Sequence, residues 1–298
     1  MTIQDEEQHA ANAIDAGAYE EAVRLLLPLA QGGSEYALLT LGWVHETGAT
    51  GVADKNNASH YYERAATIGS VSAYLYLGRL LLRDGKIREA RAAFERGVEL
   101  GSEECTSELV GLENEEAERL AANAIEAGAY EEAARLLQPL AAANSEYALI
   151  SLGWIYETGG TGVADKDAAR LLYQRAAEEG SASGFFELGR LLLSQGREIE
   201  ARLAFKCGAE RGNVPSMSRL GRMMVEGRGG PADIGEGSAW LSQAASRGHI
   251  FAQRTLLGME GRNARSLLGK WINKLKVAFL AGRGAREMLS DPGSDNVR

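Results

Sequence analysis

The chain has 298 residues, of which 45% are hydrophobic and 24% are charged, and its formal net charge is −9. This balance is typical of a folded, soluble protein and argues against a disordered chain. An acidic surface repels phosphate, so the composition also argues against nucleic acid as a partner. No stretch approaches the ~20 consecutive apolar residues of a membrane-spanning helix. The acidic start of the chain, residues 1–7, lacks the apolar run of a signal peptide.

Taken in chain order, the sequence predicts a series of helical hairpins. The first three cover 5–33, 35–70 and 72–102. An acidic junction at 103–118 follows, in which Gly111 is expected to interrupt the helix. Hairpins then resume over 121–144, 147–181, 182–213 and 214–249, and 251–261 adds one helix without a partner. Proline is scarce and β-branched alternation is absent, so the expected fold class is all-α.

The order of these hairpins reflects an internal duplication. The stretch 36–70 recurs almost intact at 147–181, an offset of 111 residues, and the same offset relates 17–22 to 128–133. A shorter repeat lies within each copy, because a Leu-Gly pair recurs with its leucine at 41, 77, 152, 188 and 220. Spacings between 20 and 50 residues indicate stacked supersecondary units that bury a core only between neighbours.

The residues of one unit predict its local geometry. A glycine inside a helix costs about 1 kcal/mol relative to alanine, so Gly42 predicts that a neighbouring helix approaches closely. Asp54 stands where an N-cap would begin the second helix of the hairpin. Gly69 is placed to end that helix in a left-handed conformation.

This pattern of a Leu-Gly pair, a Gly-Val turn, an aspartate and a final Ala-Ala-x-x-Gly resembles the Sel1-like repeat. The matching residues of the first copy are Leu41, Gly42, Gly51, Val52, Asp54, Ala58, Tyr62, Ala65, Ala66 and Gly69. Those of the second are Leu152, Gly153, Gly162, Val163, Asp165, Ala169, Tyr173, Ala176, Ala177 and Gly180, and a looser third copy covers 220–248. The intervening units, with a short turn such as 85–90 or 196–201, are more similar to tetratricopeptide repeats.

The resemblance implies a right-handed α/α superhelical solenoid of about seven hairpins. We expect a first repeat block at 1–112, a second at 113–261, a basic amphipathic helix at 262–289 and a disordered tail at 290–298. The resemblance also implies a bacterial protein and a binding surface rather than an enzyme. The two cysteines, Cys105 and Cys207, do not follow the repeat, which favours a reducing, cytoplasmic compartment.

Catalytic, metal and cofactor sites find little support in the sequence. The four histidines form no pair with metal-ligand spacing. The glycine-rich stretches 227–230 and 282–284 lack a preceding strand and the phosphate-loop lysine, so both are interpreted as turns. We therefore expect no catalytic residue, no metal and no cofactor.

Binding has a better candidate in the residue that directly follows each Leu-Gly pair. In a superhelix of this class the first helices line the concave side, so these residues would form a row there. The row consists of Trp43, Arg79, Trp154, Arg190 and Arg222, and the residues three positions earlier are Thr40, Tyr76, Ser151, Glu187 and Arg219. Tryptophan and arginine would suit a protein or peptide that carries carboxylates. The alternative is that the tryptophans pack between helices and the arginines neutralise acidic neighbours.

The stretch 262–286 contains seven basic residues and no acidic one. On a helix its apolar residues share one side, with Lys270, Lys274 and Lys276 outside it and Trp271 within it. This helix would either cap the last hairpin or dock on a partner or an anionic membrane surface. The expected function is a non-enzymatic adaptor that binds a protein or peptide. The alternative is a membrane-surface assembly or regulatory factor for envelope or polysaccharide machinery, and the oligomeric state is left open.

Overall fold

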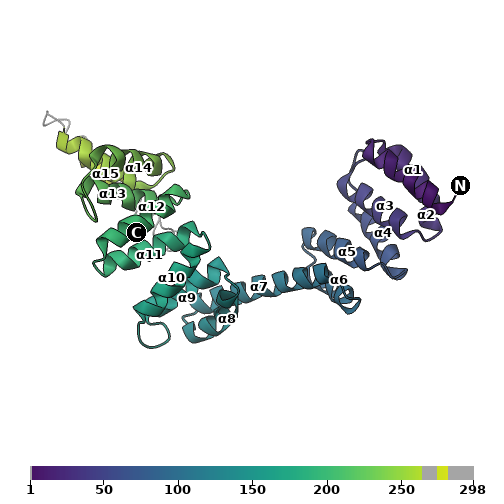
Figure 1. Ribbon diagram of the computed structural model, residues 1–298, viewed down its shortest axis with the longest axis horizontal. Helices are drawn as coiled ribbons and strands as arrows, with labels where there is room; N and C mark the ends of the chain where they lie inside the picture. The colour runs from purple at the N-terminus through teal and green to yellow at the C-terminus, as the bar shows by residue number, and fades with distance from the viewer. Residues whose placement is uncertain (1, 264–273, 281–298) are drawn as a thin grey trace. The chain divides into compact units, whose positions relative to one another are not determined.

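The computed structural model describes residues 2–263 and 274–280, and in these ranges the chain forms helices and turns without a strand (Figure 1). The all-α prediction is thereby confirmed. The helices are α1 (Ile3–Asp15), α2 (Tyr19–Gln31), α3 (Glu35–Thr47), α4 (Lys55–Thr67), α5 (Val71–Arg83), α6 (Ile87–Glu99), α7 (Glu103–Glu126), α8 (Tyr130–Ala142), α9 (Glu146–Thr158), α10 (Lys166–Glu178), α11 (Ala182–Ser194), α12 (Glu198–Glu210), α13 (Val214–Glu226), α14 (Ile234–Ser246) and α15 (Ile250–Asn263).

The chain divides into two compact units, Met1–Glu116 (unit 1) and Ala117–Arg298 (unit 2). The division falls within α7, and the repeat blocks expected at 1–112 and 113–261 stay a prediction. The expected interruption at Gly111 is wrong, because α7 runs unbroken through this residue. Leu109, Leu112 and the glutamates around Gly111 favour a helix strongly enough to outweigh the cost of about 1 kcal/mol for one glycine.

Each unit buries its core between consecutive helices. In unit 1 one cluster joins α1 to α5, and Phe94 of α6 packs with Cys105 and Leu112 in the first half of α7. In unit 2 one cluster joins the second half of α7 to α10, and another extends from α11 to Ala252 of α15. Such nearest-neighbour burial is the defining feature of a solenoid.

The glycine of each Leu-Gly pair receives a side chain from the second helix of its hairpin, as predicted. A Cβ on Gly153 would lie 2.6 Å from Cε1 of Tyr173, and Gly42 meets Tyr62 in the same way. At Gly189 the neighbour is the Phe205 ring, at 2.8 Å. At these positions the glycine lets an aromatic ring lie against the backbone of the first helix, whereas Gly221 meets the Gly237 carbonyl and the Leu241 side chain.

The longer loops also follow the predicted chemistry. Asp54 accepts a hydrogen bond from the Asn57 backbone N–H at 3.0 Å, so it is the N-cap of α4. Asp165 caps α10 and Asp233 caps α14 in the same manner. Gly69, with φ +93°, lies in the left-handed region just after α4.

Beyond α15 the structure describes one helical segment at 274–280. Leu275 is 55% exposed and Phe279 is 69% exposed, and Lys274 and Lys276 are exposed as well. Lys270, Trp271 and the expected tail at 290–298 lie outside the described residues.

Candidate binding sites on the first helices of the hairpins

An aromatic groove of about 300 Å³ lies on unit 1, at the first helices α3 and α5. Three of the predicted binding residues, Thr40, Trp43 and Tyr76, line it together. The groove also includes three residues that sequence reasoning missed, Tyr36, Leu39 and Tyr62. The aromatic side chains on its rim are accessible, with 36% of Tyr36, 40% of Trp43 and 41% of Tyr76 exposed.

We call this hollow the aromatic groove. Its rings are held in place by their neighbours. The Trp43 ring lies 6.0 Å from that of Tyr19, and Tyr62 stacks on Tyr76 at 5.6 Å. The Tyr62 hydroxyl donates to the Glu46 carboxylate at 2.6 Å. Burial, with a smaller contribution from Tyr76, raises the pKa of Tyr62, so this hydroxyl keeps its proton. The groove thus has a fixed aromatic floor and exposed aromatic edges.

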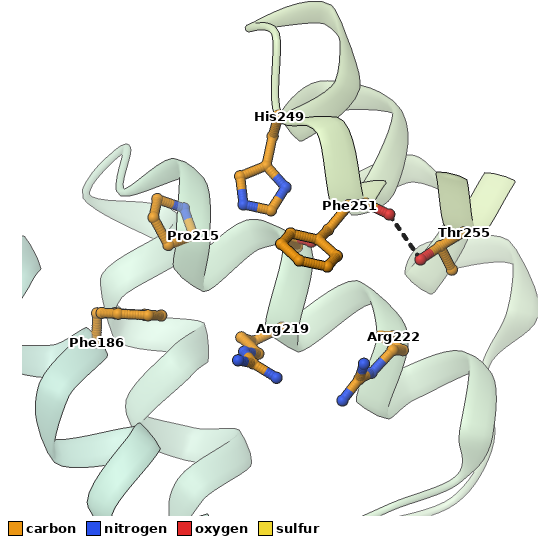
Figure 2. A pocket seen from close by; sticks show the side chains of 8 residues that line it. Phe186, Pro215, Arg219, Arg222, His249, Phe251 and Thr255 are labelled. Carbon is orange, nitrogen blue, oxygen red and sulfur yellow. Dashed lines mark hydrogen bonds between the residues drawn. The ribbon is translucent and has the colours of Figure 1, made fainter. Parts of the chain in front are cut away.

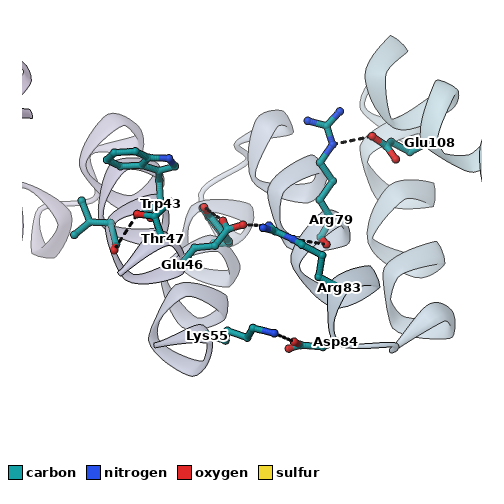
Figure 3. A network of polar contacts seen from close by, with 10 residues as sticks. Trp43, Glu46, Thr47, Lys55, Arg79, Arg83, Asp84 and Glu108 are labelled. Carbon is teal, nitrogen blue, oxygen red and sulfur yellow. Dashed lines mark hydrogen bonds and ion pairs between the residues drawn. The ribbon is translucent and has the colours of Figure 1, made fainter. Parts of the chain in front are cut away.

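Arg79, the next predicted residue of the row, is paired with an acidic side chain of the same unit. Its Nε donates to Glu108 of α7 at 2.7 Å, while Arg83, one turn further along α5, pairs with Glu46 (Figure 3). A third ion pair joins Lys55 to Asp84. The Arg79 guanidinium therefore neutralises a carboxylate of its own unit.

The equivalent region of unit 2 has different chemistry. Trp154 is half-buried and meets the Tyr130 ring edge-on at 5.7 Å. Glu187 occupies the position equivalent to Tyr76, and Arg190 donates to Glu187 at 2.7 Å and to Glu157 at 2.8 Å. The position that is aromatic in the first copy, Tyr76, is thus part of an internal ion-pair network in the second. Ser151, the predicted residue equivalent to Thr40, is half-buried.

A smaller pocket of about 60 Å³ lies at the end of unit 2, where α11, α13 and the start of α15 meet. It brings together the predicted residues Arg219 and Arg222 with His249 (Figure 2). The Nε of Arg222 is buried without a hydrogen-bond partner in the described part of the chain, and it lies 3.7 Å from Glu226 Oε1. Phe186, Pro215 and Phe251 supply apolar walls.

His249 is the residue of this pocket that sequence reasoning dismissed. It is 2% exposed, and its Nδ1 accepts a hydrogen bond from the Ala252 backbone N–H at 3.3 Å. Burial, and then the positive charge of Arg219, lowers its pKa to about 4. The sequence does contain a signal that sets His249 apart. The equivalent N-cap positions before the first helices of other hairpins hold serine or asparagine, namely Ser34, Ser70, Ser145, Ser181 and Asn213.

The other residues weighed for chemistry have structural surroundings. His45 stacks on Tyr61 at 5.4 Å. Gly227 ends α13 and Gly229 has φ +66°, so the stretch 227–230 is a turn. Within residues 2–263 and 274–280, no group of three or more histidine, cysteine or acidic side chains is arranged to hold a metal ion. In the same ranges no helix combines the length and apolarity needed to cross a membrane.

Comparisons with known proteins agree with this architecture. The model of the Sel1 repeat matches residues 36–70, 146–181 and 214–249. The structure is similar to that of a Sel1 repeat protein from Oxalobacter formigenes, with 24% identity, a TM-score of 0.60, and coverage of 86% of this chain and 87% of that one.

A second similar structure is that of c5321, described as a protective antigen present in uropathogenic Escherichia coli strains and displaying an SLR fold. The identity is 20% and the TM-score 0.59, and the match covers 95% of this chain but 62% of that one. Comparison of the sequence with curated proteins gives no match. At these identities the two structures support the fold alone. The chain therefore contains three Sel1 repeats within an α/α solenoid of helical hairpins.

Proposed function

We propose that the chain is a non-enzymatic protein-binding module, an adaptor or scaffold that holds a segment of a partner protein at the first helices of its hairpins. Solenoids of Sel1 and tetratricopeptide type generally mediate interactions between proteins and are typically non-catalytic. The observation that carries the proposal is the aromatic groove, where Tyr36, Trp43 and Tyr76 stand exposed around a hollow of about 300 Å³.

Exposed aromatic rings suit this role for a physical reason. Tyrosine and tryptophan bury a large area when a partner covers them, and they lose little rotamer entropy. Trp43 already packs on Tyr19, and Tyr76 stacks on Tyr62, which is fixed by its bond to Glu46. A partner segment would therefore meet a surface that needs little ordering on binding.

The charge of unit 1 indicates which segments it would attract. Residues 1–116 contain 20 acidic and nine basic side chains, whereas residues 117–298 contain 21 and 23. Because Arg79 and Arg83 are already paired with Glu108 and Glu46, the groove offers aromatic faces in an acidic unit rather than free guanidinium groups. Aromatic faces attract cations, and an acidic surface attracts basic segments over a Debye length. This favours a partner segment that carries lysine or arginine beside apolar residues.

The duplication supplies a matched control for the test. Tyr36 and Tyr147 are equivalent in the two copies and are 36% and 37% exposed, but only Tyr36 belongs to the aromatic groove. Partners captured by the intact chain would be compared with those captured by Tyr36→Ala, Tyr76→Glu and Tyr147→Ala variants of unchanged helicity. We expect Tyr36→Ala and Tyr76→Glu to release a partner that Tyr147→Ala retains. Equal retention by all three variants would exclude the groove as the binding site.

A second candidate function rests on the segment 274–280. Leu275 and Phe279 are one helical turn apart and exposed, and Lys274 and Lys276 are exposed beside them, which is the arrangement of an interfacial membrane helix. Co-sedimentation of the full chain with vesicles rich in an anionic lipid tests it. A Leu275→Ser/Phe279→Ser variant should lose the binding, and Leu171→Ser, a change at another exposed leucine, should retain it. Binding unaffected by the double change would exclude this segment as the anchor.

A further inference from the structure

The pocket at the end of unit 2 gathers positive and donor groups in a confined space. Arg219 and Arg222 come from α13, and His249 comes from the residue before α15 (Figure 2). The first turn of α15 also begins here, and the N-terminal end of a helix carries partial positive charge. Four features that favour an anion therefore meet at one place.

Two polar groups of the pocket indicate that it is built for a ligand. His249 is 2% exposed, and its Nδ1 is engaged as the acceptor of the Ala252 N–H, so the neutral ring carries its proton on Nε2 as a donor. The buried Nε of Arg222 has no hydrogen-bond partner in the described part of the chain. It forms an ion pair with Glu226 at 3.7 Å, which is too long for a hydrogen bond, and the Arg222 side chain as a whole is 40% exposed. Buried donors that lack an acceptor are uncommon in folded proteins and call for an explanation.

From these observations we propose that the pocket of Arg219, Arg222 and His249 binds a carboxylate group that is attached to an apolar body. The guanidinium groups would face the carboxylate oxygens, with the His249 Nε2–H as a further donor. Phe186, Pro215 and Phe251 would contact the carbon atoms next to the carboxylate. The proposal does not depend on the aromatic groove, which lies in unit 1.

Size and polarity select this ligand over other anions. The cavity of about 60 Å³ is far below the 300–1,000 Å³ usual for a complete small-molecule site, so it takes a head group while the rest of the ligand lies outside. Phe186, Pro215 and Phe251 make part of its wall apolar, which disfavours a phosphate with two charges to desolvate. A planar carboxylate also matches the fork of an arginine side chain.

The test uses small probes whose shapes match and whose charges differ. Propionate and propionamide would be titrated into the full chain while NMR follows the His249 ring. We expect propionate to move the ring resonances in a saturable way and to raise the pKa of His249 from about 4, because an adjacent anion stabilises the imidazolium. The positive charge of Arg219 opposes that protonation, and Glu226 faces Arg222 from the same helix. Equal responses to propionate and propionamide, or tighter binding of phosphate, would overturn the proposal.

A variant links the response to one residue. Arg222→Gln should weaken propionate binding about tenfold or more, the effect expected for one charge-assisted hydrogen bond. Lys206→Gln removes the same charge from an exposed position of α12 outside the pocket, so it should leave the affinity unchanged. If Arg222→Gln does not fold, Arg222→Lys, which keeps the charge but loses the fork, takes its place and should also weaken binding. Unchanged affinity in the folded variant would contradict the site.

Peptide binding distinguishes two sources of the carboxylate, the C-terminus of a chain and the side chain of a glutamate. A short peptide that ends in phenylalanine would be compared with the same peptide amidated at its C-terminus, and with an amidated form that carries a glutamate side chain. Binding of the free terminus alone assigns a chain end as the ligand, and binding of the glutamate form assigns a side chain. Equal binding of the amidated peptide without glutamate would overturn the role of the carboxylate.

Discussion

The Tyr173 ring lies against the backbone of Gly153, so closely that a Cβ on the glycine would be 2.6 Å from Tyr173 Cε1. Tyr173 is fully buried, and its hydroxyl donates to Glu157 at 3.1 Å. The ring therefore cannot turn aside, and the second helix of the hairpin reaches its position only because residue 153 has no side chain.

We expect Gly153→Ala to destabilise unit 2 in spite of alanine's better helix propensity. Overpacking destabilises a core by about 1–3 kcal/mol, and we expect the upper end of this range because the Tyr173 ring cannot move. The better helix propensity of alanine offsets about 1 kcal/mol of this loss. The net loss is roughly 1–2 kcal/mol, measured as a lower urea midpoint by circular dichroism. Gly258→Ala in α15, where nothing lies within 4 Å of the new methyl group, is the control and should raise stability by about 0.5–1 kcal/mol. Shifts of the same sign in both variants would contradict this account.

The carboxylate of Glu157 is expected to stabilise unit 2 more than any exposed ion pair. It accepts hydrogen bonds from Tyr173 and Arg190 and its side chain is only 12% exposed. Glu157→Gln leaves Arg190 with one carboxylate partner fewer, so we expect a loss of about 1–3 kcal/mol in the free energy of unfolding. Glu99→Gln, which breaks the exposed pair with Arg96, should change it by less than about 0.5 kcal/mol. Comparable losses in the two variants would show that burial does not decide the effect.

The N-caps offer a test of the loop chemistry that the three Sel1 repeats share. Asp165 accepts hydrogen bonds from the backbone N–H groups of Asp167 and Ala168 at 3.1 and 2.8 Å. Asp165→Ala removes both, so thermal unfolding should show a loss of about 1 kcal/mol. Asp165→Asn retains an acceptor and should lose less. An alanine variant as stable as the asparagine variant would mean that the cap does not hold the start of α10.

Local rules made the fold predictable. The close contact at Gly42, the cap at Asp54 and the left-handed Gly69 each depend on a few neighbouring residues, so spacing alone indicated them. Gly111 was misjudged because a single glycine does not break a long helix whose other residues favour it.

The candidate binding sites are less predictable from the sequence, because side-chain pairing acts across helices. Arg79 and Arg190 hold equivalent positions in the duplication, yet Arg79 pairs with Glu108 of α7 while Arg190 pairs with Glu157 and Glu187. At the position three residues before these arginines, the first copy has Tyr76, which stacks on Tyr62, and the second has Glu187, which pairs with Arg190. His249 joins Arg219 and Arg222 only through the contact of α13 with the start of α15, which no periodicity of the sequence reports.

His249 is expected to make the stability of unit 2 depend on pH. Its pKa is about 4 in the folded chain, against an ordinary value of 6.5, so the unfolded chain binds the proton more readily. Stability is therefore unaffected above pH 6.5 and falls as the pH decreases toward 4, by up to about 3 kcal/mol from this group. His249→Asn keeps a capping side chain but removes the titration, so its free energy of unfolding should decline less over this window. Parallel pH profiles for the intact chain and His249→Asn would mean that the buried ring accepts a proton without cost, and the positive surroundings assigned to the pocket would then be wrong.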